Sequence, residues 1–370
     1  MKAGDNETVQ DWSSKAAQDS FLANNPEFKA QKAEITRLNN ALLKVKAGTQ
    51  IIVNAIKEAY VEPPNLYVPS PPPKSRKINE EIAVLHISDT QLGKVTPTYN
   101  STVAKDRITD LVFKTVQITN MRRSNAAINA IHVYLGGDMV EGEDIFPGQA
   151  HEIDQPVFEQ SCKTAPEVFC NAILYLLEHF PTVKVCAVPG NHGRNGRKGT
   201  NSSTKTNWDM VCYEVMYWML NASEFAKKNN LSKRLTFDIP EDDFFVVDPV
   251  FDWGNLIVHG QQITGGFAGF PWYGAAKKAW GWIDAIDAPW DYLWFGHFHT
   301  YASAVLNKRV FLANGTTESS NNYAKEQLAS GGYPCQRLAF FNPSHGLISD
   351  NQIYLDNTRT PQRTRLASWQ

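Results

Sequence analysis

Residues 131–138 read Ile-His-Val-Tyr-Leu-Gly-Gly-Asp, a strand-like run that ends in two glycines and a carboxylate. Its β-branched, aromatic and aliphatic side chains predict a short buried strand over the first five residues. Glycines let the backbone turn sharply, so Asp138 should stand at the carboxyl end of that strand. Open α/β sheets keep their ligand sites at this end of the strands.

Four further apolar runs end next to polar residues that can bind a metal or transfer a proton. They cover residues 83–88, 183–188, 256–258 and 292–295, and the polar residues after them are Asp89, Gln91, Asn191, His192, His259, His297 and His299. Helices are expected at about residues 102–122, 156–179, 207–228 and 272–285. Alternating strands and helices indicate an α/β sheet domain, in which the strand ends can converge.

The composition restricts the class of protein. With 370 residues, one large or two modest domains are expected. The formal net charge of −2 gives no global signature for nucleic acid, membranes or acidic substrates, so anion recognition must be local. Five cysteines without short paired spacing favour buried thiols in a reducing compartment. No signal pattern and no apolar stretch near ~18 residues occur, which predicts a cytoplasmic protein without a membrane span.

Prolines divide the chain. Residues 1–60 show weak helical periodicity and predict a small N-terminal helical appendage. Dense prolines predict a semi-rigid, extended linker over residues 61–77. Residues 78–370 then form the main domain. The appendage either packs on this domain or serves self-association or DNA contact.

The residue types at the strand ends indicate metal chemistry. Carboxylate and amide oxygens combined with imidazoles, without thiolate, suit manganese, iron or zinc better than calcium or magnesium. A central carboxylate can bridge two cations, which at ~3.5–4 Å separation activate one water and stabilise an in-line displacement at phosphorus. The leaving oxygen still needs a proton, and a histidine that is not a ligand can donate it.

The same ordered motifs resemble the signature of the calcineurin-like metallophosphoesterases, over roughly residues 82–300. They are Asp89-Thr90-Gln91, Gly137-Asp138, Gly190-Asn191-His192, His259 and Gly296-His297-Phe298-His299. The pattern is nearest to the double-strand-break-repair nuclease branch. The resemblance implies an α/β fold, a four-layer αββα sandwich, with a dinuclear site at the strand ends.

Carried over by position, the resemblance also implies a role for each residue. The ligands would be Asp89, Gln91, Asp138 and His299 for the first ion, and Asp138, Asn191, His259 and His297 for the second. The two divalent ions would be Mn²⁺, with Fe or Zn as alternatives. His192 would protonate the leaving group or steady the transition state.

Two positions depart from the family pattern. Gln91 stands where the family usually has histidine, so the first ion should be held more loosely. Gly193 stands where many members carry an acidic residue, which puts the orientation of His192 in question. Neither departure removes the bridging carboxylate or the ligands of the second ion.

Two loops flank the expected site. The basic segment after the Asn-His pair is either a flexible surface loop or a phosphate-binding one, with Arg194, Arg197 and Lys198 as the substrate contacts. The loop beyond Asp138, which holds Glu141 and Gln149, is expected to be a solvated acidic loop. A rim that contacts substrate or a second subunit is the alternative.

The favoured function is a two-metal phosphodiesterase, a nuclease that hydrolyses DNA with a metal-activated water. One alternative is a phosphatase or phosphodiesterase of small nucleotides or phosphoproteins, which the near-neutral charge supports. Another is a non-catalytic subunit of a replication complex. The expected partner is nucleic acid, with no membrane, and the appendage is compatible with a homodimer or larger homo-oligomer.

Overall fold

The computed structural model describes residues 66–356 except 76, 78, 197–203, 265–269 and 320–332, together with single residues between 30 and 54. The chain divides into two units, residues 1–52 and 53–370. The predicted N-terminal appendage lies almost wholly outside the described residues, so the domain boundaries at 60 and 77 stay predictions. No helix among the described residues is long and apolar enough to cross a membrane.

A six-stranded sheet forms one layer, with strand order β11-β10-β1-β2-β3-β4. Strands β1 to β4 run parallel, whereas β10 is antiparallel to both β1 and β11. The strands are β1 (Glu80–Ile87), β2 (Ala127–Leu135), β3 (Thr182–Ala187), β4 (Leu235–Asp238), β10 (Cys335–Asn342) and β11 (Gly346–Tyr354).

A five-stranded sheet forms a second layer, with order β5-β6-β7-β9-β8. Strands β6, β7 and β9 are parallel, and antiparallel strands close both edges. The strands are β5 (Phe245–Val250), β6 (Trp253–Val258), β7 (Tyr292–Phe295), β8 (Ala302–Leu306) and β9 (Arg309–Ala313).

The two sheets pack face to face around one apolar core. Val84 and Tyr134 from the first sheet meet Ile257 and Trp294 from the second in a single buried cluster. Trp294 is fully buried, with the Tyr134 ring edge-on at 5.2 Å between centroids. Burial of such large aromatic side chains supplies much of the stability of a sandwich core.

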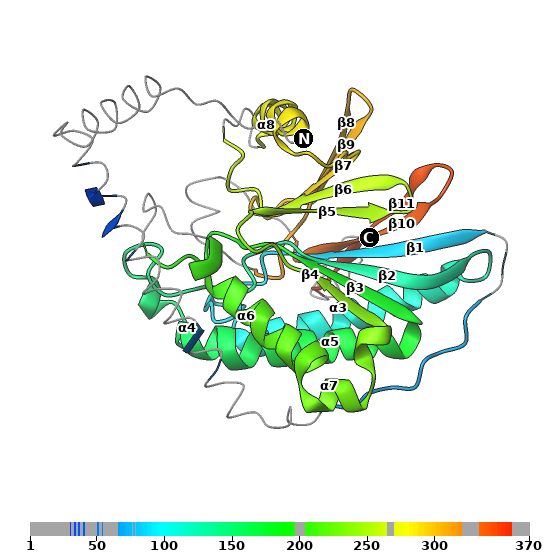
Figure 1. Ribbon diagram of the computed structural model, residues 1–370, viewed down its shortest axis with the longest axis horizontal. Coiled ribbons are helices and arrows are strands. Elements are labelled where there is room, and N and C mark those ends of the chain that lie inside the picture. The colour runs from blue at the N-terminus through cyan, green and yellow to red at the C-terminus, as the bar shows by residue number, and fades with distance from the viewer. Residues whose placement is uncertain are drawn as a thin grey trace, which may run out of the picture. The chain divides into compact units, whose positions relative to one another are not determined.

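Helices cover the outer faces of both sheets (Figure 1). Helices α3 (Ser101–Arg122), α5 (Ala165–His179) and α6 (Trp208–Tyr217) lie on the six-stranded sheet. On the other side, α8 (Trp272–Ala285) packs on the five-stranded sheet through a second apolar cluster. The order helices, sheet, sheet, helix confirms the predicted four-layer sandwich.

All four predicted helical regions are helical, but two contain π turns. A π turn at Gln160–Thr164 joins the short α4 (Val157–Glu159) to α5, and another at Trp218–Ala222 follows α6 and precedes α7 (Glu224–Lys228). The first begins at the buried Gln160, whose Oε1 accepts from the Gly142 N–H of the loop after Asp138 at 3.0 Å.

The predicted proline-rich linker is hydrogen-bonded to the main domain at three described residues, Pro69, Ser75 and Lys77, the last through the carbonyls of Arg123 and Ser124. The Pro69 carbonyl accepts from Arg234 Nη1 at 3.1 Å. Ser75 and Asn129 exchange hydrogen bonds of 2.8 and 3.1 Å. Residues 66–75 have no regular secondary structure, as expected for an extended proline-rich segment.

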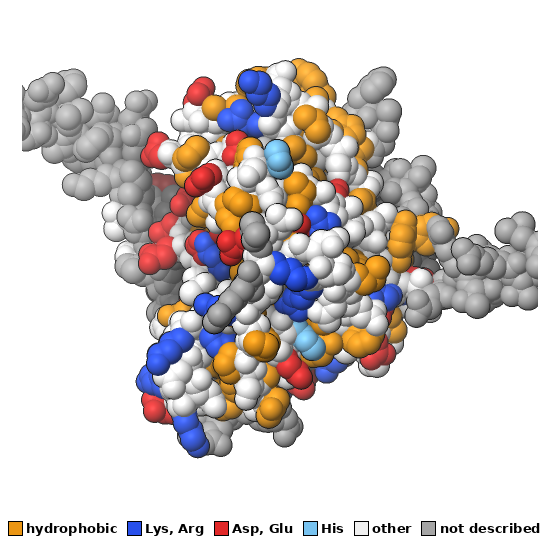
Figure 2. Space-filling view, turned by 90° about the vertical axis from the view of Figure 1, so that its right-hand side faces the viewer, with side chains coloured by type: hydrophobic (Ala, Val, Ile, Leu, Met, Phe, Trp, Pro, Cys, Tyr) orange, Lys and Arg blue, Asp and Glu red, His pale blue; other side chains and the backbone are white. Residues whose placement is uncertain are grey.

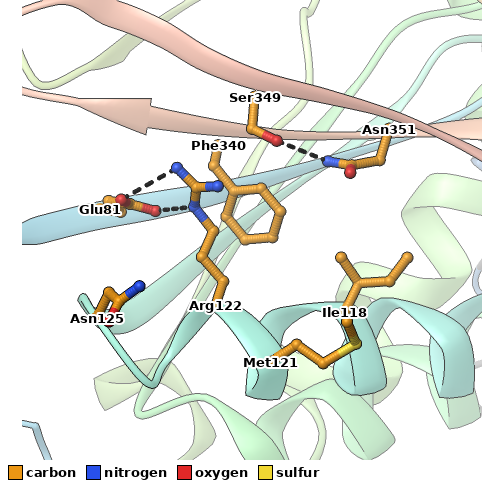
Figure 3. Close-up of a pocket in the computed structure, with 8 residues that line it drawn as sticks. All are labelled: Glu81, Ile118, Met121, Arg122, Asn125, Phe340, Ser349 and Asn351. Atoms are coloured by element: carbon orange, nitrogen blue, oxygen red, sulfur yellow. Dashed lines mark hydrogen bonds and ion pairs between the residues drawn. The ribbon is translucent and has the colours of Figure 1, made fainter.

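The end of the molecule at which β1 begins shows no single-sign charge among the side chains described there. Figure 2 shows acidic, basic and hydrophobic side chains interspersed on that face. A groove of about 360 Å³ lies between α3 and β10–β11, where Arg122 pairs with Glu81 and covers the Phe340 ring (Figure 3). Because Glu81 lies at the start of β1, this groove is remote from the strand end at Asp89.

The cysteine prediction is confirmed in its structural part. All five cysteines are free thiols and all are buried. Burial raises the pKa of the Cys170 thiol, so it remains protonated at neutral pH. These thiols act as small apolar core side chains.

Candidate metal centre

Five of the seven candidate ligands have a backbone conformation that few non-glycine residues adopt. Left-handed φ values occur at Asp89 (54°), Gln91 (43°), Asp138 (54°), His297 (67°) and His299 (50°). This conformation costs roughly 1–2 kcal/mol per non-glycine residue. Such a cluster of strained positions is typical of a functional site.

Backbone hydrogen bonds bring the strand ends together. The Asp89 N–H donates to the Gly137 carbonyl at 3.0 Å, and the Gly296 N–H donates to the His259 carbonyl at 2.8 Å. Across the sheets, both Asp89 carboxylate oxygens accept from the His297 N–H at 3.0 Å. Glycine is required at 296, because a Cβ there would lie 2.2 Å from Asp89 Oδ2.

The second cation position is a compact set of ligand atoms. One ligand atom each from Asp138, His259 and His297 lies within 4.8 Å of the others. His259 Nε2 is 2.9 Å from Asp138 Oδ2 and 3.1 Å from Asn191 Oδ1. All of these residues except the half-buried His297 are buried.

The chemistry of this set fits a divalent cation. His259 Nδ1 lies 2.8 Å from the Gly136 carbonyl, which can only accept, so Nδ1 carries hydrogen. In a neutral His259 the lone pair of Nε2 then faces two oxygen acceptors, Asp138 Oδ2 and Asn191 Oδ1. Three lone-pair-bearing atoms that face one another repel unless a positive charge lies between them. Burial lowers the pKa of His259, but the Asp138 carboxylate raises it by more, to about 9. A proton on Nε2 can therefore occupy the position that a cation would take.

The first cation position is built differently. His299 Nε2 lies 3.2 Å from Asp89 Oδ1 and 3.5 Å from the Gln91 amide nitrogen. The other His299 nitrogen, Nδ1, lies 2.9 Å from a carboxylate oxygen of Glu318. Although burial lowers it, Glu318 and Asp89 raise the pKa of His299 to about 10.

The fold is the four-layer sandwich that the resemblance to the calcineurin-like metallophosphoesterases implies. Two face-to-face sheets flanked by helices carry the polar strand ends in the expected order, and these ends meet at one site. This site brings Asp89, Asp138, Asn191, His259, His297 and His299 together. Their assignment as metal ligands stays a prediction.

A buried ionic network behind the ligands could not be seen in the sequence. Lys94 Nζ lies 2.7 Å from Glu318, 4.0 Å from Glu141 and 3.1 Å from Gln91 Oε1. Lys94 is 8% exposed and Glu318 is 3% exposed. The members come from three loops far apart in the sequence, and none of them carries a motif that would have marked it.

The expectation of a solvated acidic loop after Asp138 is wrong for Glu141 and Gln149. Both are fully buried. Gln149 Nε2 donates to Glu141 Oε1 at 3.0 Å, and the other Glu141 oxygen lies 3.1 Å from His192 Nδ1. The loop folds back toward the site because these polar groups find partners there.

His192 lies beside the ligand cluster, with its backbone N–H donating to Asp138 Oδ1 at 2.7 Å. Although burial lowers it, Glu141 raises the pKa of His192 to about 9, so its imidazole is protonated at neutral pH. Gly193 leaves no acidic side chain directly after the pair, and a Cβ there would lie 2.2 Å from Asn207 Oδ1. Glu141 therefore supplies the carboxylate for His192 from another loop.

Asp209 holds the loop of the central carboxylate. Its carboxylate accepts from the backbone N–H groups of Asp138, Met139, Val140 and Gly190 at 2.8–3.3 Å. Burial and the nearby charge of Asp138 raise the pKa of Asp209 to about 6. The sequence predicted a helix from about residue 207, and at its start Asn207 Oδ1 accepts from the Asp209 N–H at 2.8 Å. No sequence pattern indicated the four backbone hydrogen bonds to the Asp209 carboxylate.

Of the predicted substrate contacts, only Arg194 is described. Its Nε donates to the Asn191 carbonyl at 2.8 Å, which anchors the side chain next to a candidate ligand. Arg197 and Lys198 lie outside the described residues. Substrate binding by all three stays a prediction.

Comparison with known proteins gave structural likenesses alone. No protein-family model and no curated protein matches the sequence. Vacuolar protein sorting 29 from Cryptosporidium parvum is 13% identical, with 75% of this chain and 100% of that chain covered and a TM-score of 0.35. An archaeal phosphodiesterase is 9% identical over 74% of this chain and 99% of its own, with a TM-score of 0.34.

A predicted phosphoesterase from Streptococcus pneumoniae is 10% identical, with 74% of this chain and 98% of that chain covered and a TM-score of 0.28. At such scores these likenesses carry no conclusion about activity. The fold and the site rest on the two sheets and on the ligand geometry described above.

Proposed function

We propose that the chain is a metal-dependent phosphodiesterase whose substrate is DNA. The observation that carries the proposal is the place of His192, which touches the central carboxylate but does not belong to the ligand cluster. A phosphodiester releases an alkoxide that needs a proton, and a protonated imidazole beside the reacting phosphate can deliver it.

The candidate ligands, His192 and Glu141 have different roles in this proposal. Asp138, Asn191, His259 and His297 would hold a divalent cation, which would supply Lewis-acid polarisation and lower the pKa of a bound water. His192 Nδ1 is held by Glu141, so proton transfer to the leaving oxygen would occur from Nε2. Glu141 fixes the ring orientation and keeps it protonated until transfer.

Arg194 supports a diester substrate. Its Nε is fixed to the Asn191 carbonyl, so the rest of the guanidinium is pre-oriented beside the site, where it can bind phosphate. The basic segment that follows would contact further backbone phosphates, and such contacts favour a polynucleotide substrate. A small nucleotide diester is the second candidate, because the net charge of −2 supplies little attraction for long DNA.

The first experiment compares ester classes. With Mn²⁺, bis(p-nitrophenyl) phosphate should be hydrolysed and p-nitrophenyl phosphate should not. End-labelled single- and double-stranded DNA should be cleaved, and chelation should stop the reaction. A preference for the monoester would replace the proposal with a phosphatase. Cleavage of small nucleotide diesters without cleavage of DNA would select the second candidate.

The second experiment tests the phosphate contact. Arg194→Ala should raise KM for DNA more than for the small bis-ester, because a polynucleotide makes more backbone contacts. Lys308→Ala is the matched control, since Lys308 is exposed on the turn between β8 and β9. If the two substitutions changed KM equally, Arg194 would not be a substrate-binding residue.

A further inference from the structure

The orientation of the Gln91 amide is set by Lys94. Lys94 Nζ is 3.1 Å from the Gln91 side-chain oxygen, and the amide nitrogen faces His299 at 3.5 Å. An ammonium group can only donate, and of the two amide atoms only the oxygen can accept. The oxygen of Gln91 therefore points at Lys94, and its NH₂ group points at the first cation position.

This orientation prevents Gln91 from ligating a cation. A glutamine binds metals through its carbonyl oxygen, whereas the amide nitrogen offers two donors and no lone pair for a metal. Turning the amide would place its NH₂ group against the buried ammonium and break a charge-assisted hydrogen bond. That loss would weaken binding at the first position by about 10- to 100-fold, since a buried unsatisfied partner costs roughly 1–3 kcal/mol.

Lys94 is firmly placed in this role. Its ammonium pairs with Glu318 at 2.7 Å, and Glu318 in turn contacts His299 Nδ1 at 2.9 Å. Glu141 approaches the same ammonium at 4.0 Å from another loop. Two buried carboxylates and one amide oxygen thus surround one buried cationic side chain, so moving Lys94 would leave buried charges unpaired.

We propose that the centre binds one divalent cation tightly, at Asp138, Asn191, His259 and His297, and that Lys94 withdraws Gln91 from the first position. The first position then retains Asp89 and His299 beside the shared Asp138, and a second cation binds there only weakly. This inference concerns how many ions bind. It does not depend on the reaction that the site catalyses.

The test counts ions on the full chain. Protein stripped with a chelator is titrated with Mn²⁺ by calorimetry, and bound Mn²⁺ is counted after gel filtration. The wild-type chain should show one tight ion, and any second ion should bind at least about 10-fold more weakly. Two ions of similar affinity would overturn the inference, whatever the protein hydrolyses.

Two substitutions of one residue sharpen the count. Gln91→Ala should leave the single tight ion unchanged, because Gln91 does not ligate it. Gln91→His should raise the count to two tight ions, because an imidazole nitrogen can ligate from this position without using an amide oxygen held by Lys94. Loss of a tight ion in Gln91→Ala, or a count that stays at one in a folded Gln91→His chain, would contradict the assignment.

A third variant addresses Lys94 itself. Lys94→Met should free the Gln91 oxygen to turn toward the first position, and a second ion should bind more tightly than in the wild type. Thermal unfolding of each variant shows whether it is folded. Where Lys94→Met does not fold, the two Gln91 variants decide the question, because they keep the Lys94–Glu318 ion pair.

Discussion

The two cation positions use the same kinds of side chain but are supported in opposite ways. At the second position, His259 is held from behind by a neutral backbone carbonyl of Gly136, at the end of β2. At the first, His299 is held by the carboxylate of Glu318, and Gln91 is held by an ammonium. Groups behind the ligands thus decide which ligands are available to a cation, as is general for metal sites.

The largest effect should follow from removing the shared carboxylate. Asp138→Ala deletes a ligand of both positions and the acceptor of the His192 N–H. We expect no bound Mn²⁺ and a fall in kcat on the order of 10³-fold or more, because a bound cation supplies several kcal/mol of transition-state stabilisation.

Metal counting and turnover of the bis-ester check this expectation. Asp110→Ala serves as the control, because Asp110 pairs with Lys114 on α3, away from the site. A variant of Asp138 that kept its ion would show that the carboxylate is not the shared ligand.

Next in size is the effect of the proton donor. His192→Ala removes no proposed ligand, so the tight ion should stay while kcat falls by ~10²–10⁴-fold. The loss should be smaller for a nitrophenolate leaving group, which needs no proton, than for DNA. Metal counts and rates on the two substrates check this. If His192→Ala cleaved DNA as fast as the wild type, His192 would not be the general acid.

A pair of histidines two residues apart separates the two positions. His297→Ala should weaken the tight ion by more than the roughly 100-fold that loss of an outer-shell partner can cost. His299→Ala should leave the affinity of that ion unchanged, because His299 contacts Asp89 and Glu318 at the other position. Calorimetric titration of both variants is decisive, and equal losses would mean that the two positions are not distinct.

Much of this site could be predicted from the sequence because each ligand directly follows a strand. Short apolar runs predicted β1, β2, β3, β6 and β7, and the polar residues after them do meet. Local patterns also predicted the helix start at Asn207, since a cap acts within one turn.

The groups behind the ligands could not be predicted, because tertiary structure brings them there. Lys94 and Glu318 are separated by more than two hundred residues, and neither belongs to a local pattern. Glu141 sits among other acidic and polar residues, so its local sequence indicated solvent exposure. Only the folded chain shows that a buried ammonium and a histidine are its neighbours.

The smallest effect concerns the support beneath the second position. His86 on β1 is fully buried, and neither ring nitrogen has a hydrogen-bond partner among the described residues. Its Nε2 would lie 2.4 Å from a Cβ at Gly136, the residue whose carbonyl holds His259. Burial, together with the charge of Arg337, lowers the pKa of His86 to about 3.

This lowered pKa makes stability depend on pH with a definite sign. Below its ordinary value of 6.5, the unfolded chain binds a proton at His86 that the folded chain does not bind. Stability should therefore fall as the pH drops from 6.5 toward 3, by at most about 1.4 kcal/mol per pH unit from this group. His86→Leu should remove that contribution. The free energy of unfolding of the wild type, relative to that of the variant, should therefore fall by roughly 2–3 kcal/mol between pH 6.5 and 4.5. Urea unfolding of both chains in chelator measures this difference, in which the titrating groups that do not interact with His86 cancel. A difference that did not change with pH would mean that the folded chain protonates His86, so that a charged group would lie under Gly136 as charged groups lie behind the ligands of the first position.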